Sequence, residues 1–105
     1  MIVSYQVKFL RDETEKQYLK PARSVDVISM AAPDISLMRR EKYQPTIEQI
    51  QSEFKWRITQ FLRQFSILGD NDLILGAFGC GSFQNDPQLV AGVFKDVLQS
   101  TEFAT

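Results

Sequence analysis

The sequence contains no histidine and only one cysteine, Cys80, among its 105 residues. Without histidine the chain has no Ser-His-Asp triad, no Cys-His pair, no imidazole acid–base catalyst and no histidine ligand for zinc. A lone cysteine forms no internal disulfide, which fits a reducing compartment. We therefore expect neither a metal nor a cofactor in this chain.

Long apolar runs are also missing, since no segment approaches the roughly 20 apolar residues of a membrane span. The first residues, MIVSYQVKFLRD, have neither the apolar run nor the cleavage site of a signal peptide. The formal net charge is -1, and the one basic cluster, Arg39, Arg40 and Lys42, is typical of a solvated loop. We predict a cytoplasmic chain, or a nuclear one if its source is eukaryotic, with no membrane contact and no direct nucleic-acid binding.

The length of the chain predicts a single domain over residues 1–105. Three segments of this domain have the pattern of β-strands. Residues 2–10 alternate between apolar and polar side chains, which favours a strand with one buried face. Residues 25–30 form a short apolar strand that Pro33 closes. The run Leu73-Ile74-Leu75, within a strand expected at residues 72–75, is typical of a strand covered on both faces.

Two segments have the three-four apolar spacing of amphipathic helices, residues 46–65 and residues 87–98. Thr46 and Gln49 predict a capping box for the first, and Gly69 predicts its C-terminal cap. Residues 11–20 and 35–44 show no clear period and are interpreted as connections. The order strand, strand, helix, strand, helix predicts a layered α/β fold with parallel pairing.

A glycine-rich loop joins the third strand to the second helix, with Gly76, Gly79 and Gly81 in close succession. Glycine lets a backbone approach a ligand closely, and Asp86-Pro87 is a suitable helix start. Backbone N–H groups and a helix N-terminus then favour phosphate, although a tight turn that binds nothing fits the glycines equally well.

Better-known nucleotide motifs do not fit this loop. Gln84 occupies the place of the third glycine of a dinucleotide-binding fingerprint, and no Gly-Lys-Ser/Thr sequence follows. Cys80 lies near the helix start, but no base is adjacent, so we interpret it as a small side chain that packs behind the loop.

The segment LGAFGCGSFQNDPQLVAGVF resembles the phosphate-loop segment of the microbial-type poly(ADP-ribose) glycohydrolases, a branch of the macrodomain fold. Their pattern there is close to LGA-aromatic-GCG-x-F-x-N-x-P. The segments FLRDE and VDVISMAAPD are similar to two upstream strand ends of that family. The resemblance implies a macrodomain-like three-layer α/β/α sandwich with a mixed sheet. This chain would be a partial domain that supplies its central-to-C-terminal portion.

What the resemblance implies for function is binding of ADP-ribose or poly(ADP-ribose). Gly76, at the start of the loop, would be one of the ligand-binding residues, and the backbone N–H groups of the four residues that follow Phe78 would hold the diphosphate. By this resemblance those four residues are Gly79, Cys80, Gly81 and Ser82. Phe83 would pack against the distal ribose, although it equally fits a core aromatic that anchors the turn. Asn85 would hold the shape of the loop.

The chain also departs from the family pattern. The glycine triplet and the Gln-Glu-Glu loop that perform glycosidic hydrolysis are absent, and Asp34 stands where the family has Asn. The acidic cluster Asp12, Glu13 and Glu15 is interpreted as a solvated turn, so no catalytic residue is assigned.

Three functional hypotheses remain open. The first is an ADP-ribose-binding fragment that is inactive alone, and the second is a glycohydrolase that becomes active with a complementing N-terminal chain. The third is a structural or interaction module that binds no ligand. An exposed sheet edge would in addition favour self-association.

Overall fold

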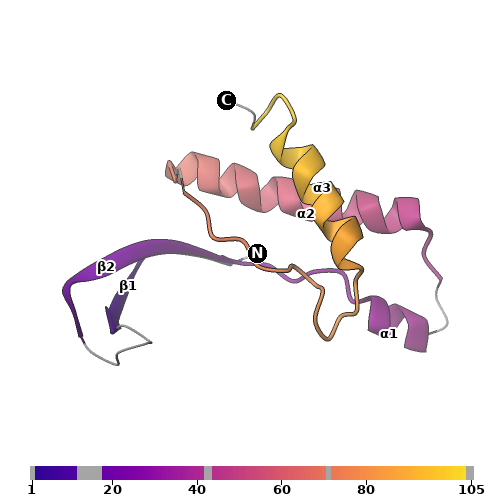
Figure 1. Ribbon diagram of the computed structural model, residues 1–105, viewed down its shortest axis with the longest axis horizontal. Coiled ribbons are helices and arrows are strands. Elements are labelled where there is room, and N and C mark those ends of the chain that lie inside the picture. Colours follow the sequence, from indigo (N-terminus) through magenta and orange to yellow (C-terminus); the bar gives the residue numbers. More distant parts are fainter. Residues whose placement is uncertain (1, 12–17, 42–43, 71, 104–105) are drawn as a thin grey trace. The chain divides into compact units, whose positions relative to one another are not determined.

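The computed structural model describes residues 2–11, 18–41, 44–70 and 72–103 (Figure 1). The chain divides into two compact units, Met1–Met30 and Ala31–Thr105. The first unit is a two-stranded hairpin, and the second contains three helices and the glycine-rich loop.

The hairpin consists of β1 (Ile2–Arg11) and β2 (Tyr18–Ser29), which pair in antiparallel orientation. Both expected strands are therefore present, and β2 begins earlier than predicted. The predicted parallel pairing is wrong for these strands. Only residues 12–17 separate them, whereas a parallel crossover needs a dozen residues or more.

A β-bulge interrupts β1 between Ser4 and Val7, where the register with β2 shifts. Gln6 lies within this bulge with a φ of 47°, and its N–H donates to Asp26 Oδ1 at 2.8 Å. The extra residue breaks the strict alternation that the sequence predicts. No side chain described in the hairpin is buried, and Tyr5 is 64% exposed, so the expected buried face is not observed in residues 2–8 and 24–30.

The longest helix is α2 (Ile47–Leu68), and both of its ends form as the sequence predicts. Thr46 Oγ1 accepts from the Gln49 N–H, while Gln49 Oε1 accepts from the Thr46 N–H, which completes the capping box. Gly69 ends the helix in the left-handed conformation with a φ of 79°. The helix continues three residues beyond the predicted end, up to this cap.

The helix that follows the loop, α3 (Pro87–Leu98), is also confirmed. Asp86 is its N-cap and accepts from the Gln88 N–H at 2.9 Å, and proline occupies the first turn.

A short helix, α1 (Ile35–Arg40), occupies a segment that the sequence predicted to be an irregular connection. Asp34 is its N-cap and accepts from the Leu37 N–H at 3.0 Å. Six residues are too few to show an apolar period, so only the ends of the helix could have signalled it, through the capping Asp34 and the basic Arg39 and Arg40 of the last turn. Arg39 and Arg40 therefore belong to a helix and not to the loop that the sequence predicted.

The strand predicted at residues 72–75 is not formed, since residues 73–77 have no regular secondary structure. The side chain of Ile74 is fully exposed, and that of Leu75 is 38% exposed. An apolar run alone does not make a strand, because a strand also needs a neighbour for its backbone groups.

The core of the second unit lies where α2 packs against α3 (Figure 1). Phe54 and Ile58 of α2 are completely buried there. The other buried apolar side chains among the described residues are Ala32, Ile35, Phe61, Leu62, Val90, Val93 and Val97. This core also positions the glycine-rich loop, which begins opposite α2 and ends at the start of α3.

Candidate functional site

The glycine loop, residues 76–85, folds into consecutive tight turns. Four backbone hydrogen bonds close it: Phe78 N–H to Gly76 O at 2.9 Å, Cys80 N–H to Ala77 O at 3.0 Å, Gln84 N–H to Gly81 O at 2.9 Å and Asn85 N–H to Gly79 O at 3.1 Å. Two of its residues, Gly79 and Gln84, have positive φ angles of 75° and 61°. Hydrogen bonds within the loop therefore close both of its turns.

Of the three glycines in the loop, Gly79 is the one that packs against the rest of the unit. A Cβ atom at this position would lie 2.6 Å from Ala32 Cβ and 2.8 Å from Asn85 Nδ2. Its φ of 75° is also a region that L side chains rarely adopt. Glycine is required here on both counts.

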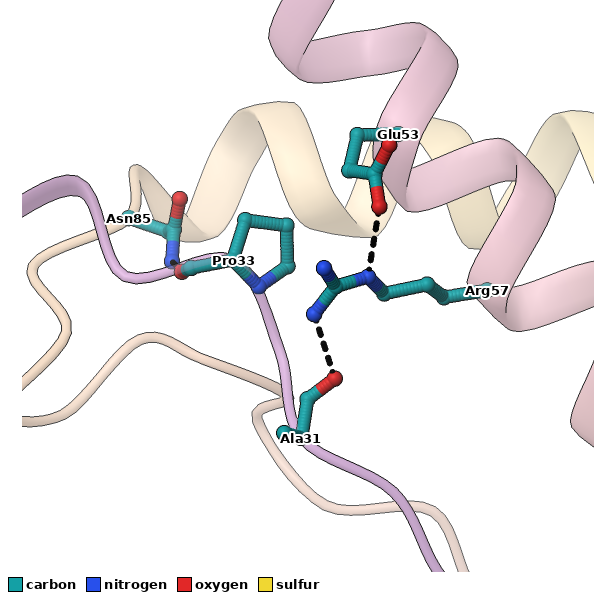
Figure 2. Close-up of polar contacts among 5 residues, drawn as sticks. All are labelled: Ala31, Pro33, Glu53, Arg57 and Asn85. Atoms are coloured by element: carbon teal, nitrogen blue, oxygen red, sulfur yellow. Dashed lines mark hydrogen bonds and ion pairs between the residues drawn. The ribbon is translucent and has the colours of Figure 1, made fainter. Parts of the chain in front are cut away.

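Asn85 fastens the loop to a segment far away in the sequence. Its side chain is buried, and its Nδ2 donates to Pro33 O at 2.7 Å (Figure 2). The same Nδ2 donates to Gly79 O at 2.8 Å. Its Oδ1 has no hydrogen-bond partner among the described residues. One amide group thus satisfies two backbone carbonyls from separate parts of the chain.

The segment of residues 31–34, which follows β2 in the sequence, is held from a second direction by α2. Arg57 Nη1 donates to Ala31 O at 2.7 Å, and its Nε pairs with Glu53 one turn earlier at 2.8 Å (Figure 2). Residues 31–34 therefore lie between α2 and the glycine loop. The sequence did not identify Arg57, because an (i, i+4) pair with Glu53 is indistinguishable from an ordinary surface pair on a helix.

Phe78 anchors the loop on α2. Its ring contacts Phe54 and Phe61 edge-on, with centroid separations of 5.8 Å and 5.7 Å. Such T-shaped contacts are a preferred arrangement of aromatic pairs. The aromatic position in the glycine-rich motif is therefore a core residue, a role that the sequence analysis did not assign.

The start of α1 is attached to the far side of the loop, where the Ser36 N–H donates to Phe83 O at 3.3 Å. The Ser36 hydroxyl also donates to Asp34 Oδ1 at 2.6 Å. This bond and that from the Leu37 N–H lower the pKa of the Asp34 carboxyl below its usual value. Asp34 thus stays ionised and acts as a helix cap.

Several backbone N–H groups of the loop have no acceptor within the part of the chain that the structure describes. These belong to Gly79, Gly81, Ser82 and Phe83. The Cys80 N–H is engaged in the turn with Ala77, and its thiol lies 3.6 Å from Phe78 O. Gly76, Gly81 and Ser82 are exposed, while Gly79, Cys80 and Phe83 are partly buried. Three of the four N–H groups predicted to hold a diphosphate thus have no acceptor among the described residues, and their ligand contacts stay predictions.

The N-terminus of α3 is already occupied by a carboxylate, because Asp86 caps it. Pro87 contributes no N–H group there. An anion at this end of the loop would therefore be bound by the loop amides, and the helix terminus would contribute little.

Metal and membrane sites are not evident in the described ranges. Those residues hold no group of three or more Cys, Asp or Glu side chains arranged for a metal ion. None of their helices is both long and apolar enough to cross a bilayer. The acidic cluster Asp12, Glu13 and Glu15 lies outside the described residues.

Solved structures resemble this chain over nearly its full length. A poly(ADP-ribose) glycohydrolase from Thermomonospora curvata matches 94% of the chain with a TM-score of 0.80 and 29% sequence identity. One from Deinococcus radiodurans, solved in complex with ADP-ribose, matches 93% with a TM-score of 0.77 and 31% identity. No family model matches the sequence, and no curated protein matches it significantly.

The matching region is a minor part of these larger structures. This chain spans 35% of the Thermomonospora structure and 39% of the Deinococcus structure. The α/β class predicted from the sequence is confirmed by both, and so is the resemblance predicted from the glycine loop. Over nearly its whole length, the chain has the fold of part of a microbial poly(ADP-ribose) glycohydrolase.

Proposed function

We propose that this chain binds ADP-ribose, or an ADP-ribose unit of poly(ADP-ribose), by holding the diphosphate on the glycine loop. The observation that carries this proposal is the set of backbone N–H groups at Gly79, Gly81 and Ser82 that have no acceptor among the described residues. Free N–H groups in a rigid turn form a favourable site for phosphate oxygens.

The construction of the loop supports the same proposal. Asn85 and Phe78 hold it to residues 31–34 and to α2, so the amides keep their positions before a ligand arrives. A preorganised site avoids the entropic cost of ordering a loop on binding. The Deinococcus structure, which this chain resembles at 31% identity, was solved with ADP-ribose bound.

Hydrolysis by this chain alone is not part of the proposal. Cleavage of a ribosyl bond needs a positioned carboxyl that protonates the leaving group or activates water. Among the described residues, Asp86, which directly follows the loop, and Asp34, whose segment is hydrogen-bonded to the loop, are both engaged as helix caps. We expect the purified chain to release no ADP-ribose from the polymer.

A substitution at Gly81 tests the binding site without disturbing the loop. A Cβ at Gly81 would meet no atom within 4 Å, and its φ is not in the positive range. The variant Gly81→Val should therefore fold normally but place a branched side chain where the diphosphate would lie. We expect its affinity for ADP-ribose, measured by titration calorimetry, to fall about tenfold or more, because hydrogen bonds to charged groups contribute about 1.5–3 kcal/mol.

Gly92→Val is the matched control, because Gly92 in α3 also has open space around it and lies outside the loop. It should leave the affinity unchanged. Equal affinities for Gly81→Val and the unmodified chain would place the ligand elsewhere. If the unmodified chain shows no binding heat and no loop NMR shifts with millimolar ADP-ribose, the loop is only a turn.

A further inference from the structure

Two arginines in the last turn of α1, Arg39 and Arg40, have no bonding partner among the described residues. The second unit contains four arginines, and the other two, Arg57 and Arg63, form ion pairs from α2. The guanidinium groups of Arg39 and Arg40 make no hydrogen bond or ion pair in the described part of the chain, and both residues are exposed. The helix dipole favours cations at this end, and it leaves both groups free to bind an anion as well.

The arginine pair lies within reach of the glycine loop, because the start of α1 is bonded to that loop. The Ser36 N–H donates to Phe83 O at 3.3 Å, and Arg40 is only about 6 Å further along the helix axis. Long side chains of a helix lean towards its N-terminus. In agreement, the charge of Arg40 acts on the Asp34 carboxylate at the N-cap and contributes to its lowered pKa. The guanidinium group of Arg40 thus points towards the end of α1 that contacts the loop.

The polymer of ADP-ribose has a chemistry that two neighbouring anion sites can recognise. Each unit carries one diphosphate, and consecutive units are joined through their riboses. A polymer whose first diphosphate is held by the loop amides therefore brings a second diphosphate close by, only two ribose rings away. Free ADP-ribose has no such second group. Guanidinium groups bind phosphate oxygens through paired, charge-assisted hydrogen bonds.

We propose that Arg39 and Arg40 bind the diphosphate of the neighbouring unit when the glycine loop holds one unit of poly(ADP-ribose). This inference rests on the function proposed above, and it names the polymer as the preferred ligand of the same site. Free ADP-ribose would contact the loop alone. The polymer would gain a second charged contact and bind more tightly, with no change in the loop itself.

The test compares two ligands on the full 105-residue chain by titration calorimetry. They are free ADP-ribose and a dimer of two ADP-ribose units. A dimer offers two units to one loop, which alone makes binding about twofold tighter, whereas a second linked contact adds a larger gain. We expect the dimer to bind about tenfold more tightly or better. The double variant Arg39→Gln with Arg40→Gln should lose this preference for the dimer and keep the affinity for free ADP-ribose.

Two further double variants separate a specific contact from bulk charge. Lys8→Gln with Lys95→Gln removes the same charge from exposed positions in β1 and in the last turn of α3, and it should keep the preference for the dimer. Arg39→Lys with Arg40→Lys keeps the charge and should restore most of the preference, because lysine binds phosphate as a point charge. Circular dichroism at 222 nm checks that every variant has the helix content of the unmodified chain.

The two proposals fail in distinguishable ways. Binding of free ADP-ribose without a dimer preference beyond about twofold would overturn the role of the arginines and leave the loop site intact. Equal weakening of both ligands in Arg39→Gln with Arg40→Gln, or equal loss in the lysine control, would also overturn it. If the unmodified chain binds neither ligand, the proposed function fails, and the inference about the arginines falls with it.

Discussion

The two units of this chain are stabilised in different ways. All buried apolar side chains among the described residues lie in Ala31–Thr105, where α2, α3 and the loop enclose them. The hairpin of Met1–Met30 is regular in its backbone pairing but buries none of its described side chains. Isolated two-stranded hairpins are marginal in water, because backbone bonds alone exchange for bonds to water at little net gain. Secondary structure and a hydrophobic core are therefore separable properties in this molecule.

The largest expected contrast comes from deleting one apolar side chain in each unit. Phe54→Ala removes a fully buried ring that contacts Phe78 and should lower the free energy of unfolding by about 3–5 kcal/mol. Val27→Ala, at a position 36% exposed in β2, should change it by about 0.5 kcal/mol or less. Urea denaturation followed by circular dichroism at 222 nm measures both. Similar losses for the two variants would show that the hairpin also contributes to the core.

An intermediate effect is expected from the amide that fastens the loop. Asn85→Ala leaves the Pro33 carbonyl without its donor and the Gly79 carbonyl with only the backbone N–H of residue 85, and it should cost about 1–3 kcal/mol. Amide NMR shifts should move at Gly79 and Phe83 but stay constant in the hairpin. Gln88→Ala, an exposed change in the first turn of α3, serves as the control and should have little effect. Shifts in the hairpin of similar size would contradict the separation of the two units.

The smallest expected effect is a loss of stability at acid pH. It concerns the second unit alone, because Asp34 lies there. The folded-state pKa of Asp34 is lowered, so the unfolded chain binds this proton more readily. The stabilisation is complete above the unfolded pKa of about 3.9 and is lost as the pH falls through the lower folded value. We expect α1 to loosen in that acidic window.

The measurement is a titration of the Asp34 carboxyl by ¹³C NMR. Ser36→Ala removes the hydroxyl donor, which is the largest cause of the shift, and should raise the observed pKa towards its ordinary value. An unchanged midpoint in Ser36→Ala would mean that another group holds the carboxylate.

Local signals in the sequence predicted the two long helices well. The ends of α2 follow from Thr46, Gln49 and Gly69, and the start of α3 follows from Asp86 and Pro87, because caps act through residues that are neighbours in the chain. The motif of the glycine loop likewise predicted the family resemblance that the solved structures confirm.

Contacts between distant residues were not predictable in the same way. Nothing local indicates that Asn85 bonds to Pro33 or that Arg57 bonds to Ala31, since these pairs are set by how the chain packs. The prediction of parallel pairing was wrong for β1 and β2. The order of strands and helices along the chain favours a layered fold with parallel strands, but residues 12–17 are too short a connection for a parallel crossover. The expected strand at residues 72–75 was wrong because hydropathy says nothing about whether a partner strand is present.

The contact between Gly79 and Ala32 has a consequence for protein engineering. A methyl group at each of these positions would overlap, with the added Cβ only 2.6 Å from that of Ala32. The loop motif carries only half of this contact, so a graft onto another scaffold keeps it only if a segment with a small side chain in the place of Ala32 is transplanted as well. The portable unit is a pair of segments, and a search for similar loops should use both.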